Sequence, residues 1–304
     1  MTFLLGTAQW GWTLQRTEAF LLLDNWLKAG HRAVDCATNY PINRNPADFR
    51  AAEKILHEYI RAHGLHDLNI TMKIGSLDNL RSPDVNLAPS FVLMMGEEYL
   101  RLFDQNLRCV MFHWDNRDDS EAICDSLGSL AILEKNYGLR PGLSGIAHPE
   151  VYAHANADLG LGFDIQLKHN VFQSDHAHYA PLRATSPTSS PSLTYAYGIN
   201  GGGVKLDADY RSDSTYLARG GDPERVAAKL DQIRDLLPQW ATAFVRPPVK
   251  TMNHIGLINV GLHPDISGIV LGLSSAAQLH ETLDFWRNVE AFDYTDVWAA
   301  LQKM

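Results

Sequence analysis

The segment HRAVDCATNY, residues 31–40, begins as a short β-rich run and passes into a polar loop that carries a tyrosine. Three other runs share this character: LNITMKI from Leu68, RCVMFHW from Arg108 and GFDIQLK from Gly162. In total, β-rich runs end near residues 7, 37, 74, 114, 145, 168, 198 and 272. Eight such runs suggest a barrel.

Stretches with helical periodicity alternate with these runs. Apolar residues three or four apart predict helices at about 17–29, 49–63, 91–106, 119–137, 149–157, 223–240 and 276–290. Asp222, Pro223 and Glu224 provide a cap, a first-turn proline and an acid in the right order for a helix start. The alternation indicates a parallel sheet, either closed or open and doubly wound. We expect an α/β protein with one (β/α)8 TIM barrel over residues 1–304.

Two segments interrupt the alternation. Residues 169–193 hold at most a short helix and include a Ser/Pro/Thr tract, which favours an irregular surface excursion. Residues 200–221 are glycine-rich and follow a strand end, where barrel enzymes place binding loops. We therefore expect long loops after strands six and seven, with the second as a candidate lid over a cofactor or substrate.

The composition is that of a globular protein with a large core. A net charge of −9 and a pI near 5.8 argue against nucleic acid or an anionic membrane as partner. Three cysteines lack metal-type spacing, and neither a leader nor a run of apolar residues long enough to span a membrane is evident. These features predict a cytoplasmic protein, and they leave its oligomeric state open.

Four chemically useful side chains fall at successive strand ends. Asp35, Lys73 and His113 close the second, third and fourth runs, and Tyr40 lies just after the second. Taken singly, Asp35 could be a turn cap, Lys73 a surface lysine and His113 a satisfied core histidine. Together they suit hydride reduction of a carbonyl, because the oxygen gains negative charge and needs a proton donor. Tyr40 would donate, Lys73 would favour its phenolate, and the reaction needs no metal.

Several segments resemble the aldo-keto reductase superfamily. GHRAVDCATNY at 30–40 is similar to its signature, in which four residues separate an aspartate from a tyrosine. Four short segments resemble, in this order, the family's first strand, its second helix, the strand with the catalytic lysine and the strand with the histidine. They are LLGTAQWGW, AAEKIL, TMKIG and FHWD. Four further segments resemble later parts of the family's chain and occur in the family's order: PGLSG, DIQLKHN, AYGINGGG and GIVLGLSSAAQLHETL. The resemblance thus spans nearly the whole chain.

The resemblance implies an NAD(P)H-dependent reductase of an aldehyde or ketone, with polar loops that hint at a sugar-like substrate. Asp35, Tyr40, Lys73 and His113 would form the catalytic tetrad, with Asp35 holding Lys73 and His113 orienting the carbonyl. Ser144 and Gln166 would hold the nicotinamide carboxamide, and Tyr197 would stack on its ring. The remaining cofactor contacts would come from Gly6, Thr7, Asp35, Gly272, Ser274, Ser275 and Gln278.

The chain also departs from the family pattern. Gly145 replaces the usual asparagine, which removes one amide contact to the carboxamide, and Gly198, Ile199 and Asn200 replace Ser-Pro-Leu. No lysine or arginine lies between Gly272 and Gln278 to meet a 2′-phosphate, so we expect weak discrimination with a modest lean to NADP(H) over NAD(H). The distant cations that could restore the preference are Lys205, Arg211 and Arg219.

Other interpretations remain open. The same tetrad could oxidise an alcohol or lactol, or the chain could be a regulatory subunit that binds the cofactor with little turnover. His176 with His178 or His169 could ligate a metal, although loop histidines are the better default. The run HWDNRDD at 113–119 could bind a hydroxylated substrate, although it more often marks a solvated helix start.

Overall fold

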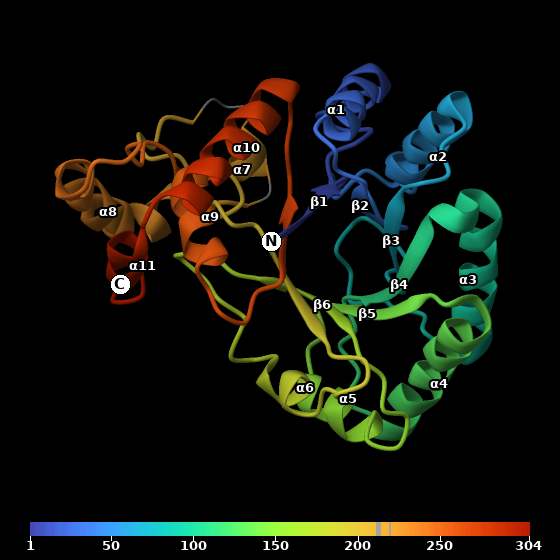
Figure 1. Cartoon of the computed structure of the whole chain (residues 1–304). Coiled ribbons are helices and arrows are strands. Elements are labelled where there is room, and N and C mark those ends of the chain that lie inside the picture. Colours follow the sequence, from blue (N-terminus) through green and yellow to red (C-terminus); the bar gives the residue numbers. More distant parts are fainter. Residues whose placement is uncertain (211–213, 219) are drawn as a thin grey trace.

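The protein is a closed barrel of eight parallel strands. The computed structural model describes residues 1–210, 214–218 and 220–304. The strands pair in chain order and β1 closes on β8 (Figure 1). They are β1 (Thr2–Gly6), β2 (Ala33–Ala37), β3 (Asn69–Ile74), β4 (Leu107–His113), β5 (Arg140–Ser144), β6 (Asp164–Lys168), β7 (Leu193–Tyr197) and β8 (Gly268–Leu271). The predicted barrel is confirmed, and each strand ends within one residue of its predicted end.

The helices predicted from periodicity surround the barrel. They are α1 (Arg16–Lys28), α2 (Ala51–His63), α3 (Pro89–Phe103), α4 (Ser120–Tyr137), α5 (Pro149–Ala155), α8 (Pro223–Ala243) and α10 (Ala276–Ala291). The Asp222 side chain accepts a hydrogen bond from the Glu224 amide at 3.0 Å, as the start signal of α8 predicted. The predicted C-terminal end of α3, residue 106, lies three residues beyond the observed end at Phe103. The helix ends there because Asp104 has a φ of 50° and the chain turns into η2 (Asp104–Asn106).

Other helices were not predicted. These are η1 (Pro46–Asp48), α7 (Thr215–Ala218), α9 (Met252–Gly261) and α11 (Thr295–Leu301). α9 is buried along most of its length, so its sequence is apolar all round and lacks the periodicity of a surface helix. Between residues 169 and 193, the one helix is the short α6 (Ala180–Ala184), as expected. Both predicted long loops, after β6 and after β7, are present.

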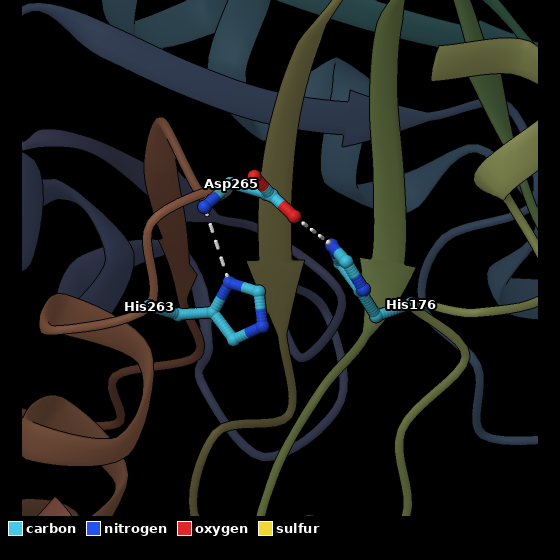
Figure 2. A group of neighbouring side chains, drawn as sticks. All are labelled: His176, His263 and Asp265. Atoms are coloured by element: carbon cyan, nitrogen blue, oxygen red, sulfur yellow. Dashed lines mark hydrogen bonds and ion pairs between the residues drawn. The ribbon is translucent and has the colours of Figure 1, made fainter. Parts of the chain in front are cut away.

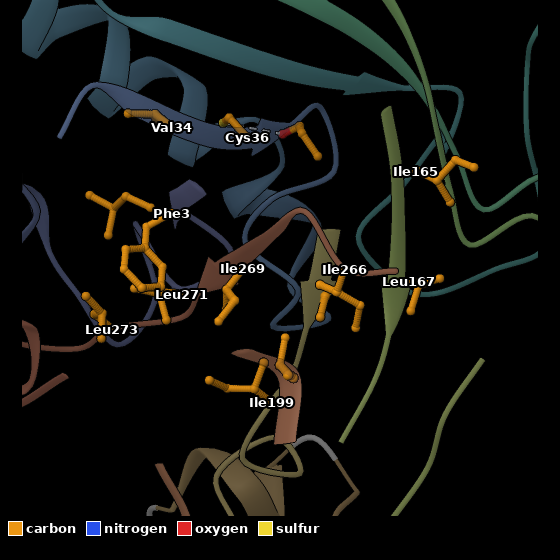
Figure 3. Close-up of a cluster of buried hydrophobic side chains, with 14 of the residues drawn as sticks. Phe3, Val34, Cys36, Ile165, Leu167, Ile199, Ile266, Ile269, Leu271 and Leu273 are labelled. Carbon is orange, nitrogen blue, oxygen red and sulfur yellow. Dashed lines mark hydrogen bonds between the residues drawn. The ribbon is translucent and has the colours of Figure 1, made fainter. Parts of the chain in front are cut away.

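The main core lies between the barrel strands and the helices. Phe3 packs edge-on against Trp286 of α10 with ring centroids 5.2 Å apart. Val34 and Cys36 belong to the same core as Phe3 (Figure 3). Side chains alternate across a strand, so Asp35 faces the opposite side, the barrel interior. A second, smaller cluster holds Leu4, Tyr195 and Val270. The strands thus turn their functional residues inward.

Within the described part of the chain, no helix has both the length and the apolar character required to cross a membrane.

Candidate active site

The four predicted catalytic side chains converge at one end of the barrel. Lys73 and Asp35 form an ion pair whose side chains are 1% and 2% exposed. Lys73 Nζ lies 4.8 Å from the centre of the Tyr40 ring. The Tyr40 and His113 rings are nearly perpendicular, with centroids 5.9 Å apart. One end of the barrel therefore carries an acid, a lysine, a tyrosine and a histidine in contact.

The charges around Tyr40 favour a neutral phenol beside a cation. Burial raises the pKa of Tyr40, and the Lys73 charge opposes that rise. Burial opposes the charge on Lys73, but the Asp35 carboxylate and the Tyr40 phenol raise the Lys73 pKa above its ordinary value. Tyr40 therefore carries a proton, and the neighbouring ammonium can stabilise the phenolate that remains once this proton is given up.

His113 is a neutral ring in a buried position. Burial and the nearby Lys73 charge lower the pKa of His113 well below its usual range. Its Nδ1 atom is buried and has no hydrogen-bond partner among the described residues. A satisfied core histidine would have such a partner. The structure therefore disfavours the interpretation of His113 as a packing residue.

Two residues assigned from the sequence to the cofactor contact Asp35 in this structure. Gln166 donates from Nε2 to Asp35 Oδ1 at 2.6 Å, and its Oε1 lies 3.4 Å from Lys73 Nζ. Thr7 donates from its hydroxyl to the Asp35 carbonyl at 3.0 Å. Both residues fix the position of the acid in the ion pair. A contact from Gln166 to the nicotinamide stays a prediction.

The loop after β4 is anchored by a buried acid. Asp115 is fully buried and accepts hydrogen bonds from Arg117 and from the Tyr152 hydroxyl. Asp115 is therefore neither part of a solvated helix start nor free to bind a hydroxylated substrate. Both interpretations of the run at 113–119 are wrong for this residue. Asp119 behaves as predicted, because it caps α4 by accepting from the amides of Glu121 and Ala122.

Trp114 fills the space beside Gly145. A Cβ atom on Gly145 would lie 2.4 Å from Trp114 Cδ1, and both residues have left-handed backbones, with φ of 66° and 61°. The Trp114 ring also lies 4.6 Å from the His113 ring. An asparagine at position 145 therefore has no room. The departure from the family pattern at this position is coupled to an indole supplied by the neighbouring strand.

A groove of about 1150 Å³ adjoins the ends of β7 and β8. Gly272, Ser274 and Gln278 line it, and a contact from each to the cofactor stays a prediction. Ser275 caps α10 by accepting from the Gln278 amide at 3.2 Å. The glycine-rich loop after β7 forms another wall through residues 198–207. The groove thus unites two segments that the sequence associated with the cofactor.

Other predicted contacts lie apart from the residues that line this groove. Ser144 and Tyr197 end β5 and β7, and Gly6 ends β1 opposite Asp35. These positions belong to the barrel end, next to the tetrad.

Two lysines contribute charge to the groove. Lys205 lines it, and its Nζ donates to the Asp209 carbonyl at 2.9 Å. Lys250 also lines it, immediately before Thr251, the cap of α9. Sequence reasoning missed Lys250, although a lysine and threonine before an apolar helix were the available signal. Arg211 and Arg219 lie outside the described residues.

A closed parallel barrel with this tetrad at its mouth and a groove beside it defines a class of barrel oxidoreductases. The chain belongs to the aldo-keto reductases, since the family model described as "Aldo/keto reductase family" matches residues 2–177. Membership implies an NAD(P)-dependent oxidoreductase that acts on a small carbonyl compound.

Among solved structures, the chain is similar to the aldo-keto reductase AKR11C1 from Bacillus halodurans in its holo form. The identity is 15%, with a TM-score of 0.70 over 99% of this chain and 91% of that one. At this identity the likeness establishes the fold alone. No curated protein matches the sequence.

Proposed function

We propose that the protein reduces an aldehyde or ketone to an alcohol, with Tyr40 as general acid and NAD(P)H as cofactor. The observation that carries this proposal is the buried, protonated Tyr40 beside the charged Lys73–Asp35 pair, with neutral His113 on its other side. Carbonyl reduction by hydride requires a proton donor and a group that stabilises the conjugate base of that donor.

Each tetrad residue has one role in this scheme. The bound cofactor supplies the hydride. Tyr40 gives its hydroxyl proton to the carbonyl oxygen as negative charge develops there, and Lys73 stabilises the resulting phenolate. Asp35 keeps Lys73 charged and in place, assisted by Gln166. The neutral His113 ring can donate an N–H to the same oxygen and so orient the substrate. The reverse reaction, oxidation of an alcohol or lactol, would use Tyr40 as base.

The groove fits an extended dinucleotide. Its volume of about 1150 Å³ lies somewhat above the range of about 300–1,000 Å³ that is typical of small-molecule sites, as a long, extended ligand requires. Ser274 lies just before the start of α10, where amides and the helix dipole favour phosphate. Lys205 and Lys250 add positive charge to the lining of the groove, which also holds Asp207 and Glu281. These features support NADP(H) as the preferred cofactor, with NAD(H) also accepted.

The proposal is tested with a panel of aldehydes, ketones and reducing sugars and both reduced cofactors. We expect turnover with the wild-type protein, and a loss of at least about a hundredfold in kcat for Tyr40→Phe. Cofactor affinity, followed by tryptophan fluorescence, should stay unchanged, because the lost hydroxyl serves the proton transfer. Tyr137→Phe removes a hydroxyl from a tyrosine that is 49% exposed and is the matched control.

Two results would contradict the proposal. Near-normal turnover in Tyr40→Phe would exclude Tyr40 as general acid. Tight cofactor binding by the wild type without turnover on any member of the panel would favour the regulatory, cofactor-binding alternative.

A further inference from the structure

Three side chains with metal-binding atoms meet on the flank of the barrel. His176 lies in the loop between β6 and α6, and His263 and Asp265 lie in the loop that leads into β8. One ligand atom from each lies within 4.8 Å of the others. Figure 2 shows the three side chains turned toward one another. None of them lines the cofactor groove.

The hydrogen bonds of this cluster define which atoms are available. His176 Nε2 is buried and makes no hydrogen bond, although Asp265 Oδ2 lies 3.2 Å away. The Nδ1 of the same ring faces Arg183 Nη2 at 3.3 Å. His263 Nδ1 accepts from the Asp265 amide at 3.2 Å, which leaves Nε2 as the ring nitrogen available to an ion. Both rings are neutral in this arrangement, because each accepts a hydrogen bond at Nδ1.

We propose that His176, His263 and Asp265 bind one divalent transition-metal ion of the zinc class. Two imidazole nitrogens and a carboxylate oxygen form a donor set that suits Zn²⁺ and its neighbours in the first row better than Mg²⁺ or Ca²⁺. Three protein ligands leave a fourth position for water. The sequence raised His176 with His178 or His169 as possible ligands but favoured ordinary loop histidines and no metal. His178 faces the Ile146 carbonyl at 3.2 Å instead.

The spacing requires a small adjustment. Ligand atoms around tetrahedral zinc lie about 3.3 Å apart, given bonds near 2.05 Å. The contact of 3.2 Å between His176 Nε2 and Asp265 Oδ2 already has this length. His263 must move inward by up to about 1.5 Å from the 4.8 Å limit. It lies in a loop, and the Asp265 side chain is 54% exposed, so rotation of these side chains can close the site.

Binding moves one proton within each histidine. The metal takes Nε2, and the proton that Nε2 carried moves to Nδ1, so the rings stay neutral and no proton leaves. The Nδ1 atoms then stop accepting, and the contacts from Arg183 and from the Asp265 amide are lost. The two contacts, at 3.3 and 3.2 Å, lie at the long end of the hydrogen-bond range, so this loss is modest. Arg183 nevertheless opposes the ion through its charge.

A bound ion would tie the loop after β6 to the loop before β8. An ion that binds only the folded chain stabilises it by an amount that grows with the logarithm of the ratio of ion concentration to Kd. At a hundredfold excess over Kd we expect the Tm to rise by about 4 °C for a chain of 304 residues. This readout does not involve catalysis.

The test uses tag-free protein stripped with EDTA and titrated with ZnCl₂ by calorimetry. We expect one ion per chain with a Kd of about 10 μM or below. His263→Ala and Asp265→Asn should weaken binding at least about tenfold and, at the same Zn²⁺ concentration, cut the rise in Tm to about half or less. Arg183→Gln should tighten binding by about fivefold, because it removes the opposing charge and the competing donor. The matched control is His154→Ala, an exposed histidine on α5.

A second measurement avoids dependence on the variants. Co²⁺ added to the wild-type protein should give the visible absorption of a tetrahedral site, and Zn²⁺ should bleach it. The proposal fails if wild-type protein binds neither ion below millimolar concentration, if His263→Ala binds as tightly as wild type, or if His154→Ala loses binding equally. A far-UV circular dichroism spectrum like that of the wild type confirms that each variant is folded.

Discussion

Replacing Lys73 with methionine is expected to destabilise the fold as well as slow the reaction. Lys73 and Asp35 are 1% and 2% exposed, so the substitution leaves a carboxylate buried without its counter-ion. Breaking such a pair costs about 3–5 kcal/mol. Gln166 keeps its 2.6 Å hydrogen bond to Asp35, which places the expected loss near the lower value, about 3 kcal/mol.

That loss converts to a measurable shift in melting temperature. Unfolding entropy of about 2.1 cal/mol/K per residue gives roughly 0.64 kcal/mol/K for 304 residues, so the Tm of Lys73→Met should fall by about 5 °C. Urea unfolding at pH 7, followed by tryptophan fluorescence, gives the free energy directly. Turnover should fall in parallel, because the phenolate of Tyr40 loses its nearest cation.

A double-mutant cycle isolates the interaction free energy of Lys73 with Asp35 from the contacts that each residue makes elsewhere. Asp35→Asn alone leaves Lys73 charged without its counter-ion, whereas the double variant buries no net charge. We expect the double variant to lie within about 1.5 kcal/mol of wild type, so that the coupling free energy is at least about 2 kcal/mol. Additive losses, or a cost below about 1 kcal/mol for Lys73→Met, would refute the account of a buried, charged pair.

Three further outcomes follow from the structure. Burial lowers the folded-state pKa of His254 to about 4, and burial together with the Lys73 charge lowers that of His113. Each therefore adds stability that is complete above the unfolded value of about 6.5 and is lost as the pH falls. The free energy of unfolding in urea should thus drop between pH 7 and pH 5, by about 2 kcal/mol from His254 with a further loss from His113, and equal stability at both would be inconsistent with this. Gly145→Asn should destabilise the fold by about 1–3 kcal/mol because its Cβ overlaps Trp114, and thermal melts should show that Gly128→Ala, in open space on a helix, costs nothing. Lys250→Gln should weaken NADP(H) about fivefold and leave NAD(H) unchanged in a fluorescence titration, whereas equal effects on both would place Lys250 away from the 2′-phosphate.

The strands were predictable because a barrel imposes a short, repeated pattern. Runs such as LNITMKI end where a polar residue meets a loop, and Lys73 marks that boundary within its run. α9 was not predictable by the same means. Its residues are buried on every side, so the amphipathic period on which helix prediction depends is missing. The glycine-rich loop was recognisable by composition.

The tetrad was predictable for a related reason. Parallel strands bring their carboxyl ends to one edge, so residues at successive strand ends must lie close together, as Asp35, Lys73 and His113 do. Contacts between loops obey no such rule. His176 meets Asp265 because two irregular segments approach on the barrel flank, and Lys250 enters the groove because α9 begins there. Neither approach leaves a periodic signal in the chain.

Trp114 and Gly145 show why a departure from a family pattern needs the three-dimensional neighbour before it can be interpreted. The sequence alone shows only that Gly145 lacks the side-chain amide of the family's usual asparagine. In the fold, the Trp114 indole occupies the volume that any side chain there would need, and the left-handed backbones of both residues make the fit possible. The two positions must therefore change together, since a side chain at 145 clashes and a small residue at 114 leaves a void. The wall beside His113 is consequently an apolar ring, and because the Gln166 amide contacts Asp35 and Lys73, Ser144 is the predicted carboxamide contact whose side chain has no such partner among the described hydrogen bonds.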